Sequence, residues 1–476
     1  MTSASAVTSI TPVVPPLRLR RRALPFALAC LVATSGLLSE PAAAQKPKPS
    51  TAQATTPYVT KAGDTLYEIA ARYLRDPGDW KALTRLNHVP APRRLPAGMQ
   101  LRLPVALLKQ ERMSARVIAT SGPAEHASGN SPYTPLATDM TLGEGDHLRT
   151  GPNGFATLEL ADGSHLSVPQ NSQIDIGSLR QTVLTGVNDR VIDLRHGEVD
   201  SEVTHAVKKD DRFQIRSPSV VAGVRGTVFR VSYDRADQST AVEVLDGAVG
   251  VDSAATAPRA PGVPLNASSQ LVPAHFGSVT HASGAVGGPV ELLPPPAVAD
   301  PGKIQDAKDV VFDVVPSASA RGYRVQIARD ADLLDMIRDQ RVGEPKASFG
   351  DVPDGTYFVR VSSIDVNGLQ GLPQVYAFER RQLGLTASAA QRAGTHDYEF
   401  RWFVGRQGVP TRFRFVLAGS ADLHDPIIDR PDLTNGQIVI SDLPKGVYYW
   451  TVIAEQFESG KFYAKGSSVR SFTLAR

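Results

Sequence analysis

The chain has 476 residues, too many for one hydrophobic core, and this length predicts an array of three to five domains. Lys and Arg number 51 and Asp and Glu 48, but residues 1–44 hold four of the arginines and one acid, Glu40. Without that segment, basic and acidic residues both number 47. This balance argues against nucleic-acid binding, which relies on an excess of positive charge.

Residues 1–44 have the pattern of a signal peptide. Basic residues from Arg18 precede an apolar run that starts at Ala23, and Ala42-Ala43-Ala44 provides small residues for cleavage. We therefore expect an exported chain that begins near Gln45. The sixteen apolar residues are fewer than the roughly 20 of a membrane-spanning helix, so we expect membrane attachment only if this segment is retained. Lipidation of Cys30 and twin-arginine export through residues 20–22 stay open as alternatives.

Cys30 is the only cysteine of the sequence, so no cysteine follows the predicted cleavage site. The exported domains must then be stabilised by ordinary cores, because no disulfide can form within the chain. Residues 45–56 are rich in Pro, Lys, Ser and Thr and predict an extended linker.

Residues 57–104 predict a compact unit of strand, helix, helix and strand. Thr65 and Glu68 have the spacing of a capping box, which places the start of the first helix directly after Gly63-Asp64. Apolar residues then recur at helical spacing on one face. A second helix is expected to begin at or just before Asp79 and to end near Asn87, with Asn87 as its C-terminal cap. Alternating apolar residues in "MQLRLP" predict the closing strand.

This unit resembles the LysM domain, a βααβ module that binds glycans containing N-acetylglucosamine, such as peptidoglycan and chitin. The resemblance is carried by matching residues in order over the whole unit: Tyr58, Val59, Gly63, Asp64, Thr65, Leu66, Ile69, Ala70, Tyr73, Trp80, Leu83, Asn87, Leu95, Gly98, Leu101 and Pro104. The stretch "HVPAPRR" before Leu95 departs from the family pattern by its length.

The resemblance implies that two loops flank a groove for the acetamido groups of the glycan. Its predicted glycan-binding residues are Gly63, Asp64, Thr65 and Leu66 in the first loop and Asn87, His88, Val89 and Leu95 in the second. Unpaired amides at the start of the first helix supply the polar rim of such a groove. The alternative for Asp64 and Thr65 is that they only cap the helix. We expect Tyr73 and Trp80 to lie in the core rather than to stack on a sugar.

Residues 115–253 consist of short alternating runs separated by glycines and predict an all-β domain, with hairpin turns at Asp162-Gly163 and Asp246-Gly247. The segment resembles the FecR domain, whose most telling element appears here as Ser217-Pro218, Val224-Arg225-Gly226-Thr227 and Phe229. The best-known FecR proteins are membrane-spanning regulators of extracytoplasmic sigma factors.

Residues 254–300 are rich in Pro, Gly and Ala and predict a linker, in which "QLVPAHFGSVTH" has the pattern of one or two extra strands. The remainder contains an internal repeat: the sequence at Tyr323 aligns with that at Phe413, and the sequence at Asp351 with that at Asp442. Alternating strands and Pro/Gly turns predict two β-sandwiches, residues 301–381 and 382–476, which resemble fibronectin type III domains. Tyr357 and Tyr448 are expected to pack inward.

The sequence predicts no catalytic residues, metal ligands or cofactor. The ten histidines form neither H-x-H nor H-E-x-x-H, and the "DGSHL" segment, residues 162–166, is typical of a hairpin turn. Arg225 stands alone in an apolar run and is expected to form a structural ion pair, a binding surface being the alternative.

The predicted fold class is therefore multidomain and mainly β: a small α+β LysM module, an all-β FecR-like domain and two β-sandwiches. We expect a non-enzymatic protein of the periplasm, associated with the cell wall. Its predicted partner is peptidoglycan or a chitin-like glycan, and its β domains are expected to serve as a scaffold or as a platform for an envelope protein. The alternative is a regulator that acts through the FecR domain on an extracytoplasmic sigma factor pathway, for which the 22 residues before Ala23 are too few to form a cytoplasmic domain.

Overall fold

The computed structural model describes residues 54–205, 208, 210–255, 268–281, 285–406, 408–458 and 460–474. The predicted signal peptide and most of the following linker lie outside these residues. The described chain is mainly β, with 54% of the residues in strands and 5% in helices, which confirms the predicted fold class. None of its helices is long and apolar enough to cross a membrane.

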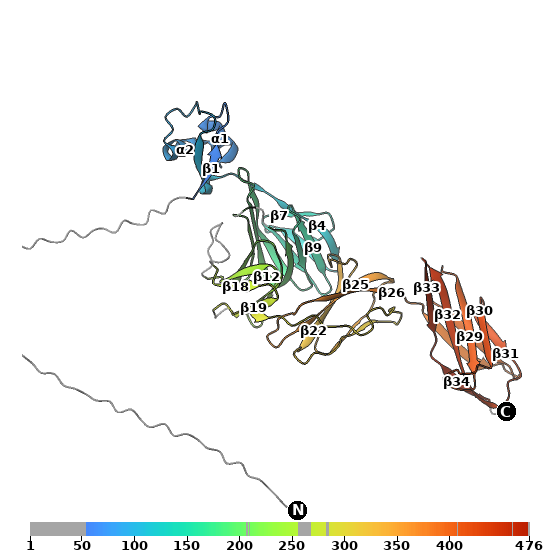
Figure 1. The fold of residues 1–476 in the computed structure, drawn as a ribbon. Coiled ribbons are helices and arrows are strands. Elements are labelled where there is room, and N and C mark those ends of the chain that lie inside the picture. The colour runs from blue at the N-terminus through green and yellow to red at the C-terminus, as the bar shows by residue number, and fades with distance from the viewer. Residues whose placement is uncertain are drawn as a thin grey trace, which may run out of the picture. The chain divides into compact units, whose positions relative to one another are not determined.

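The N-terminal module spans residues 54–108 and folds as predicted around two short helices (Figure 1). Its elements are β1 (Thr55–Val59), α1 (Leu66–Tyr73), a 3-10 turn (Pro77–Asp79), α2 (Trp80–Asn87) and β2 (Gln100–Pro104), followed by a second 3-10 turn (Val105–Leu107). β1 and β2 pair antiparallel, with Tyr58 opposite Leu101. Both helices bury one apolar face against this ribbon, and Tyr73 and Trp80 pack at the edge of the core as expected.

Strands β3 to β20 form a closed barrel around the largest hydrophobic core. Its strands are β3 (Gln110–Arg112), β4 (Ser114–Ser121), β5 (Ala124–Ser128), β6 (Thr134–Pro135), β7 (Thr141–Gly143), β8 (Asp146–Thr150), β9 (Phe155–Leu160), β10 (His165–Val168), β11 (Gln173–Thr182), β12 (Asn188–Val203), β13 (Arg212–Arg216), β14 (Val220–Val224), β15 (Thr227–Asp234), β16 (Ser239–Asp246), β17 (Ala248–Ser253), β18 (Gln270–Pro273), β19 (Phe276–His281) and β20 (Val290–Glu291). The last three strands come from the segment predicted as a linker and pair with β17, β16 and β19 respectively.

The predicted hairpin at Asp162-Gly163 is confirmed, because β9 and β10 pair across it. The predicted hairpin at Asp246-Gly247 is wrong. There β16 pairs with β15 and β19, whereas β17 pairs with β14 and β18. The Asp-Gly turn therefore carries the chain from one face of the barrel to the other, since the two strands find their partners elsewhere in the sequence.

Two β-sandwiches follow, each with its own core. The first contains β21 (Val310–Asp313), β22 (Gly322–Ala328), β23 (Met336–Val342), β24 (Lys346–Phe349), β25 (Gly355–Ile364) and β26 (Gln374–Arg380). The second contains β27 (Leu385–Gln391), β28 (Tyr398–Val404), β29 (Thr411–Ala418), β30 (Ile428–Leu433), β31 (Gln437–Ile440), β32 (Gly446–Glu458), β33 (Lys461–Gly466) and β34 (Arg470–Leu474). The strand orders β23-β22-β25-β26 and β30-β29-β32-β33 match between the two.

The internal repeat is confirmed by the strand register. In the first sandwich Ala328 pairs with Phe358, and in the second Ala418 pairs with Tyr449, so both partners move by the offset of the sequence repeat. Tyr357 and Tyr448 are each 5% exposed and pack inward, as predicted from their positions after a Pro/Gly turn.

The barrel contacts the first sandwich through buried charges. Glu198, on β12, accepts hydrogen bonds from Arg324 and from Arg341, the latter at 2.6 Å. Asp200 on the same strand accepts one from Arg360 at 2.7 Å. Glu198 and Asp200 occupy alternate positions of β12, and the arginines come from β22, β23 and β25, so the sandwich covers this part of the outward face of β12.

Candidate functional site

The start of α1 is capped by the side chain that the sequence predicted. The Thr65 hydroxyl accepts a hydrogen bond from the Glu68 amide at 3.1 Å and donates one to the Glu68 carboxylate at 3.0 Å. Gly63, two residues earlier, has a φ of +89°, a backbone conformation that residues other than glycine rarely adopt. The turn is therefore specific to glycine at residue 63, and Thr65 is confirmed as the N-cap. The second half of the predicted capping box is not formed, because the Glu68 carboxylate accepts from the Thr65 hydroxyl and not from the Thr65 amide.

This turn lies directly beside the second loop. The Leu66 amide, the first of the helix, donates a hydrogen bond to the Pro92 carbonyl oxygen at 2.9 Å. The Glu68 amide is occupied by the cap. Within the part of the chain that the structure describes, the Thr65 and Tyr67 amides donate to no acceptor. Two amides at a helix N-terminus therefore stay open to a ligand, between the loops that the sequence singled out.

The side chain of Asp64 stabilises this turn through hydrogen bonds. Its carboxylate accepts hydrogen bonds from the Tyr58 hydroxyl at 2.8 Å and from the Lys61 amide at 2.7 Å. Burial and the hydrogen bond to Asp64 raise the pKa of Tyr58 to about 12. One carboxylate oxygen of Asp64 is thus committed to the fold, where it holds the turn in place.

Tyr67 is a candidate that the sequence reasoning missed. It follows Leu66, which is completely buried, and its own side chain is 58% exposed beside the open amides. The sequence feature that could have identified Tyr67 is its place in the helical pattern, because it lies off the apolar face formed by Leu66, Ile69 and Ala70. A large aromatic side chain on the polar side of a helix offers a flat apolar surface to a sugar ring.

The second-loop residues serve different purposes. Val89 and Leu95 are buried in the core of the module and anchor the two ends of the loop. His88 is exposed and adopts the left-handed conformation that ends α2, with a φ of 51°, so His88 and not Asn87 is the C-terminal cap. The Asn87 amide instead bonds Leu83 and the backbone of Arg102 on β2.

The module is attached to the barrel at the opposite end of α1. The Lys109 amide donates to the Tyr73 carbonyl oxygen at 2.7 Å, and the Val183 amide of the barrel donates to the Lys109 carbonyl oxygen at 3.0 Å. Leu184 of the barrel packs on the core of the module. An eight-residue helix is about 12 Å long, and this length separates the attachment from the open amides.

Comparison with known families decides the identity of two segments. Residues 58–104 match the family model of the LysM domain, and residues 146–250 match that of the FecR protein. The chain carries a LysM domain and a FecR domain. The LysM domain is thus the N-terminal module with the open amides, and the FecR match lies within strands β8 to β17 of the barrel. Both resemblances predicted from the sequence are confirmed.

Solved structures are similar to parts of the chain at low identity. A protein from Parabacteroides distasonis, provisionally assigned as an anti-sigma factor, has 16% identity and a TM-score of 0.22 over 29% of this chain, which spans 56% of that protein's length. Fibronectin(III)-like modules of CbhA from Clostridium thermocellum have 11% identity and a TM-score of 0.20, covering 37% of this chain and 90% of theirs. The FN1–FN3 domains of chicken CNTN1 have 13% identity and a TM-score of 0.21, covering 52% and 98%. A search of curated proteins found no match.

The FecR family found outside the LysM domain is a non-catalytic signalling domain family. The barrel residues that resemble a catalytic set have structural partners. Ser164 is completely buried, and its hydroxyl donates to Asp162 at 3.0 Å and accepts from the Thr204 amide at 3.1 Å. Asp162 also pairs with Arg190. Within the described ranges, no three His, Cys, Asp or Glu side chains are arranged to hold a metal ion.

The predicted ion pair of Arg225 is wrong. This residue lies in the bend between β14 and β15 rather than in a strand, it is half-buried, and it forms no ion pair with any described residue. The buried arginine of this segment is Arg230, 1% exposed, which donates to the Gln370 carbonyl oxygen at 2.6 Å. The apolar pattern around residue 225 identified a buried segment but not the position whose side chain needs a partner.

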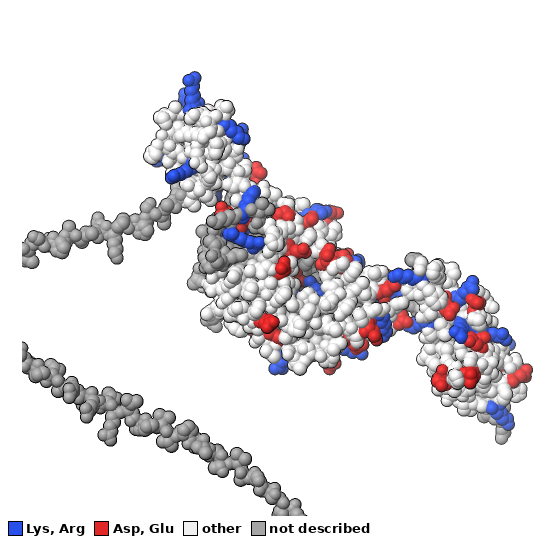
Figure 2. Space-filling view, viewed as in Figure 1, with Lys and Arg blue, Asp and Glu red and all other residues white. Residues whose placement is uncertain are grey.

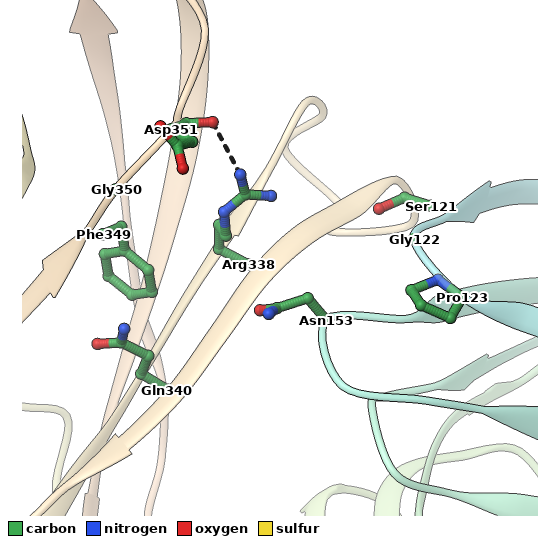
Figure 3. A pocket seen from close by; sticks show the side chains of 9 residues that line it. All are labelled: Ser121, Gly122, Pro123, Asn153, Arg338, Gln340, Phe349, Gly350 and Asp351. Atoms are coloured by element: carbon green, nitrogen blue, oxygen red, sulfur yellow. Dashed lines mark hydrogen bonds between the residues drawn. The ribbon is translucent and has the colours of Figure 1, made fainter.

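Two hollows lie at the boundary of the FecR domain and the first sandwich. One, of about 610 Å³, includes His196, Arg341 and Asn367 in its wall. The other, of about 390 Å³, is drawn in Figure 3, where Asn153 of the barrel faces Arg338 and Gln340 of the sandwich. Arg338 there donates to the Asp351 carbonyl oxygen at 2.8 Å, and no side chain drawn has a buried polar atom without a partner. The second hollow therefore offers a ligand no unpaired buried side-chain atom, whereas the buried Nδ1 atom of His196, in the wall of the first, has no partner among the described residues.

Proposed function

We propose that this protein is a non-enzymatic component of the cell envelope that binds the N-acetylglucosamine units of wall glycan through its LysM domain. The observation that carries the proposal is the pair of open amides, at Thr65 and Tyr67, held between two loops by the hydrogen bond from Leu66 to Pro92. Amides that lack an internal acceptor are suited to the carbonyl oxygen of an acetamido group. The exposed ring of Tyr67 adds an apolar surface for the sugar.

The attachment of the LysM domain supports the same proposal. The contacts with the barrel lie at the C-terminal end of α1, whereas the open amides lie at its N-terminal end. The remaining domains then form a scaffold or a platform for another envelope protein. The exported, periplasmic location rests on the sequence of residues 1–44 and on the envelope association of both domain families.

The proposal is tested by co-sedimentation of the chain from Gln45 onward with insoluble peptidoglycan and by calorimetric titration with chitooligosaccharides. Tyr67→Ala is expected to weaken binding by about five- to tenfold, as loss of an aromatic contact does. Phe403→Ala is the matched control, because Phe403 is also 58% exposed but lies in the second sandwich. Unchanged binding by Tyr67→Ala, or an equal loss in both variants, would contradict the assignment of the glycan site to Tyr67 and the open amides.

A regulatory role is the second candidate, and the FecR match over residues 146–250 favours it. In that case the barrel contacts a protein of a sigma factor pathway. Deletion of the gene region for residues 110–476 would then alter transcription of an extracytoplasmic regulon, whereas deletion of residues 57–104 alone would not. A change of transcription that requires the LysM domain as well would instead make wall binding part of the signal.

A further inference from the structure

The positive charge of the chain is concentrated at its N-terminal end. Residues 45–104 contain ten Lys or Arg against four Asp or Glu, whereas residues 105–476 contain 37 against 43. The LysM domain, residues 58–104, holds eight of those ten basic residues. Figure 2 shows several of their side chains on its visible face. The N-terminal end, which holds the proposed glycan site, is therefore cationic, and the remainder of the chain is acidic.

Two of these basic residues, Arg93 and Arg94, lie beside the proposed glycan site. Their turn is closed by a hydrogen bond from the Arg94 amide to the Ala91 carbonyl oxygen at 3.1 Å. Pro92, the residue before Arg93, accepts the hydrogen bond from Leu66 that joins the two loops. Buried Val89 and Leu95 anchor the loop on both sides, so the backbone of Arg93 and Arg94 is held beside the first turn of α1.

Both arginines are unpaired within the part of the chain that the structure describes. Both are exposed, and neither forms an ion pair or a side-chain hydrogen bond with any residue that the structure describes. The two carboxylates of the turn form other hydrogen bonds: one oxygen of Asp64 accepts from Tyr58 and Lys61, and one oxygen of Glu68 accepts from Thr65. Guanidinium groups without an internal partner are free to bind a carboxylate of a ligand, which they do with two parallel hydrogen bonds.

This arrangement distinguishes the two polymers that the LysM family accepts. Peptidoglycan and chitin share the acetamido sugar, but chitin is neutral, whereas the peptide stems of peptidoglycan carry carboxylates close to the glycan chain. We propose that Arg93 and Arg94 bind these stem carboxylates and give the domain a preference for peptidoglycan over chitin. The inference rests on the proposed glycan-binding function and deepens it.

The test compares binding of the chain from Gln45 to peptidoglycan sacculi and to insoluble chitin at low and at moderate salt. Arg93→Gln combined with Arg94→Gln is expected to lower the affinity for sacculi about three- to tenfold, the range for two exposed charge contacts. The same variant should lose most of the salt dependence of sacculus binding and bind chitin within about twofold of the unmodified chain. The arginine variant and the unmodified chain should bind equally well to sacculi stripped of their peptide stems.

Lys81→Gln combined with Arg102→Gln is the matched control. These exposed residues lie on α2 and β2, and the double change removes the same charge from the same domain. An equal loss of sacculus binding in this control, or an equal loss on chitin and sacculi in the arginine variant, would overturn the assignment of Arg93 and Arg94. If the unmodified chain binds chitin and sacculi equally, only this inference fails. If it binds neither polymer, the proposed function itself fails.

Discussion

Asn87 illustrates how one side chain can connect two elements. Its amide donates to the Leu83 carbonyl oxygen at 3.0 Å and to the Arg102 carbonyl oxygen at 2.9 Å, and its oxygen accepts from the Arg102 amide at 2.6 Å. The residue predicted to contact glycan is thus saturated by contacts within the LysM domain. Its effect on a ligand is indirect, because it fixes α2 and the following loop against β2.

Asn87→Ala is therefore expected to destabilise the LysM domain by about 1–3 kcal/mol, since it removes three hydrogen bonds and leaves a strand amide unpaired. Calorimetric unfolding of the chain measures this change. Glycan affinity at a temperature where the domain stays folded should change less than in Tyr67→Ala. A loss of affinity without a loss of stability would instead place the Asn87 side chain in the ligand site.

Among the elements, β12 has the most unusual role. Its first part, up to His196, pairs with β11, and its last part, from Gly197, pairs with β15. Gly197 has a φ of +79°, and a Cβ atom there would lie 2.5 Å from the Ser172 Cα atom and 2.6 Å from the Asn171 carbonyl oxygen. The strand can change partners at this point because glycine permits both the backbone conformation and the close approach.

We expect Gly197→Ala to cost the barrel about 2–4 kcal/mol, because backbone atoms must move and the conformation is strained. Gly143→Ala is the control: Gly143 lies in β7, and an added Cβ would meet no atom within 4 Å. Calorimetric unfolding should show a lower midpoint for the barrel in the first variant only. Equal midpoints for the two variants would contradict the assignment of Gly197 as the point where β12 changes partners.

At the scale of the whole molecule, the FecR domain and the first sandwich are joined through a buried network of charges. Arg324 is 2% exposed and bonds both Glu198 of the barrel and Asp339 of its own sandwich. Burial raises the pKa of Glu198, but Arg324 and Arg341 outweigh it and hold that pKa well below its ordinary value. Removal of one partner from such a network leaves an uncompensated charge, so the two domains are expected to unfold together.

Glu198→Gln should therefore lower the stability of the joined domains by about 3–5 kcal/mol at neutral pH. Because the pKa of Glu198 is depressed in the folded protein, its contribution is complete above the unfolded value of about 4.3 and is lost as the pH falls below it. The difference in the free energy of unfolding between the unmodified protein and the variant should accordingly become smaller in acid. Calorimetry across this pH range measures it, with Glu202→Gln, an exposed neighbour on β12, as the control. A difference that stays constant in acid would show that Glu198 is not the titrating group.

The sequence by itself determined the elements whose signals lie within a few residues of each other. Local backbone preference predicted the helix start at Thr65, the helical spacing of Leu66, Ile69 and Ala70, and the alternation of the barrel strands. Direct comparison within the chain predicted the repeat at Tyr323 and Phe413.

Only the tertiary structure decided which strands and charges meet. Asp246-Gly247 has the local sequence of a hairpin but connects two faces of the barrel, and Glu198, Asp200 and Glu202 look alike as outward positions of one strand. Glu198 and Asp200 are covered because arginines more than a hundred residues later fold over them, whereas Glu202 stays exposed. Local propensity fixes the shape of a segment, but burial depends on the residues that closure of the whole chain brings against it.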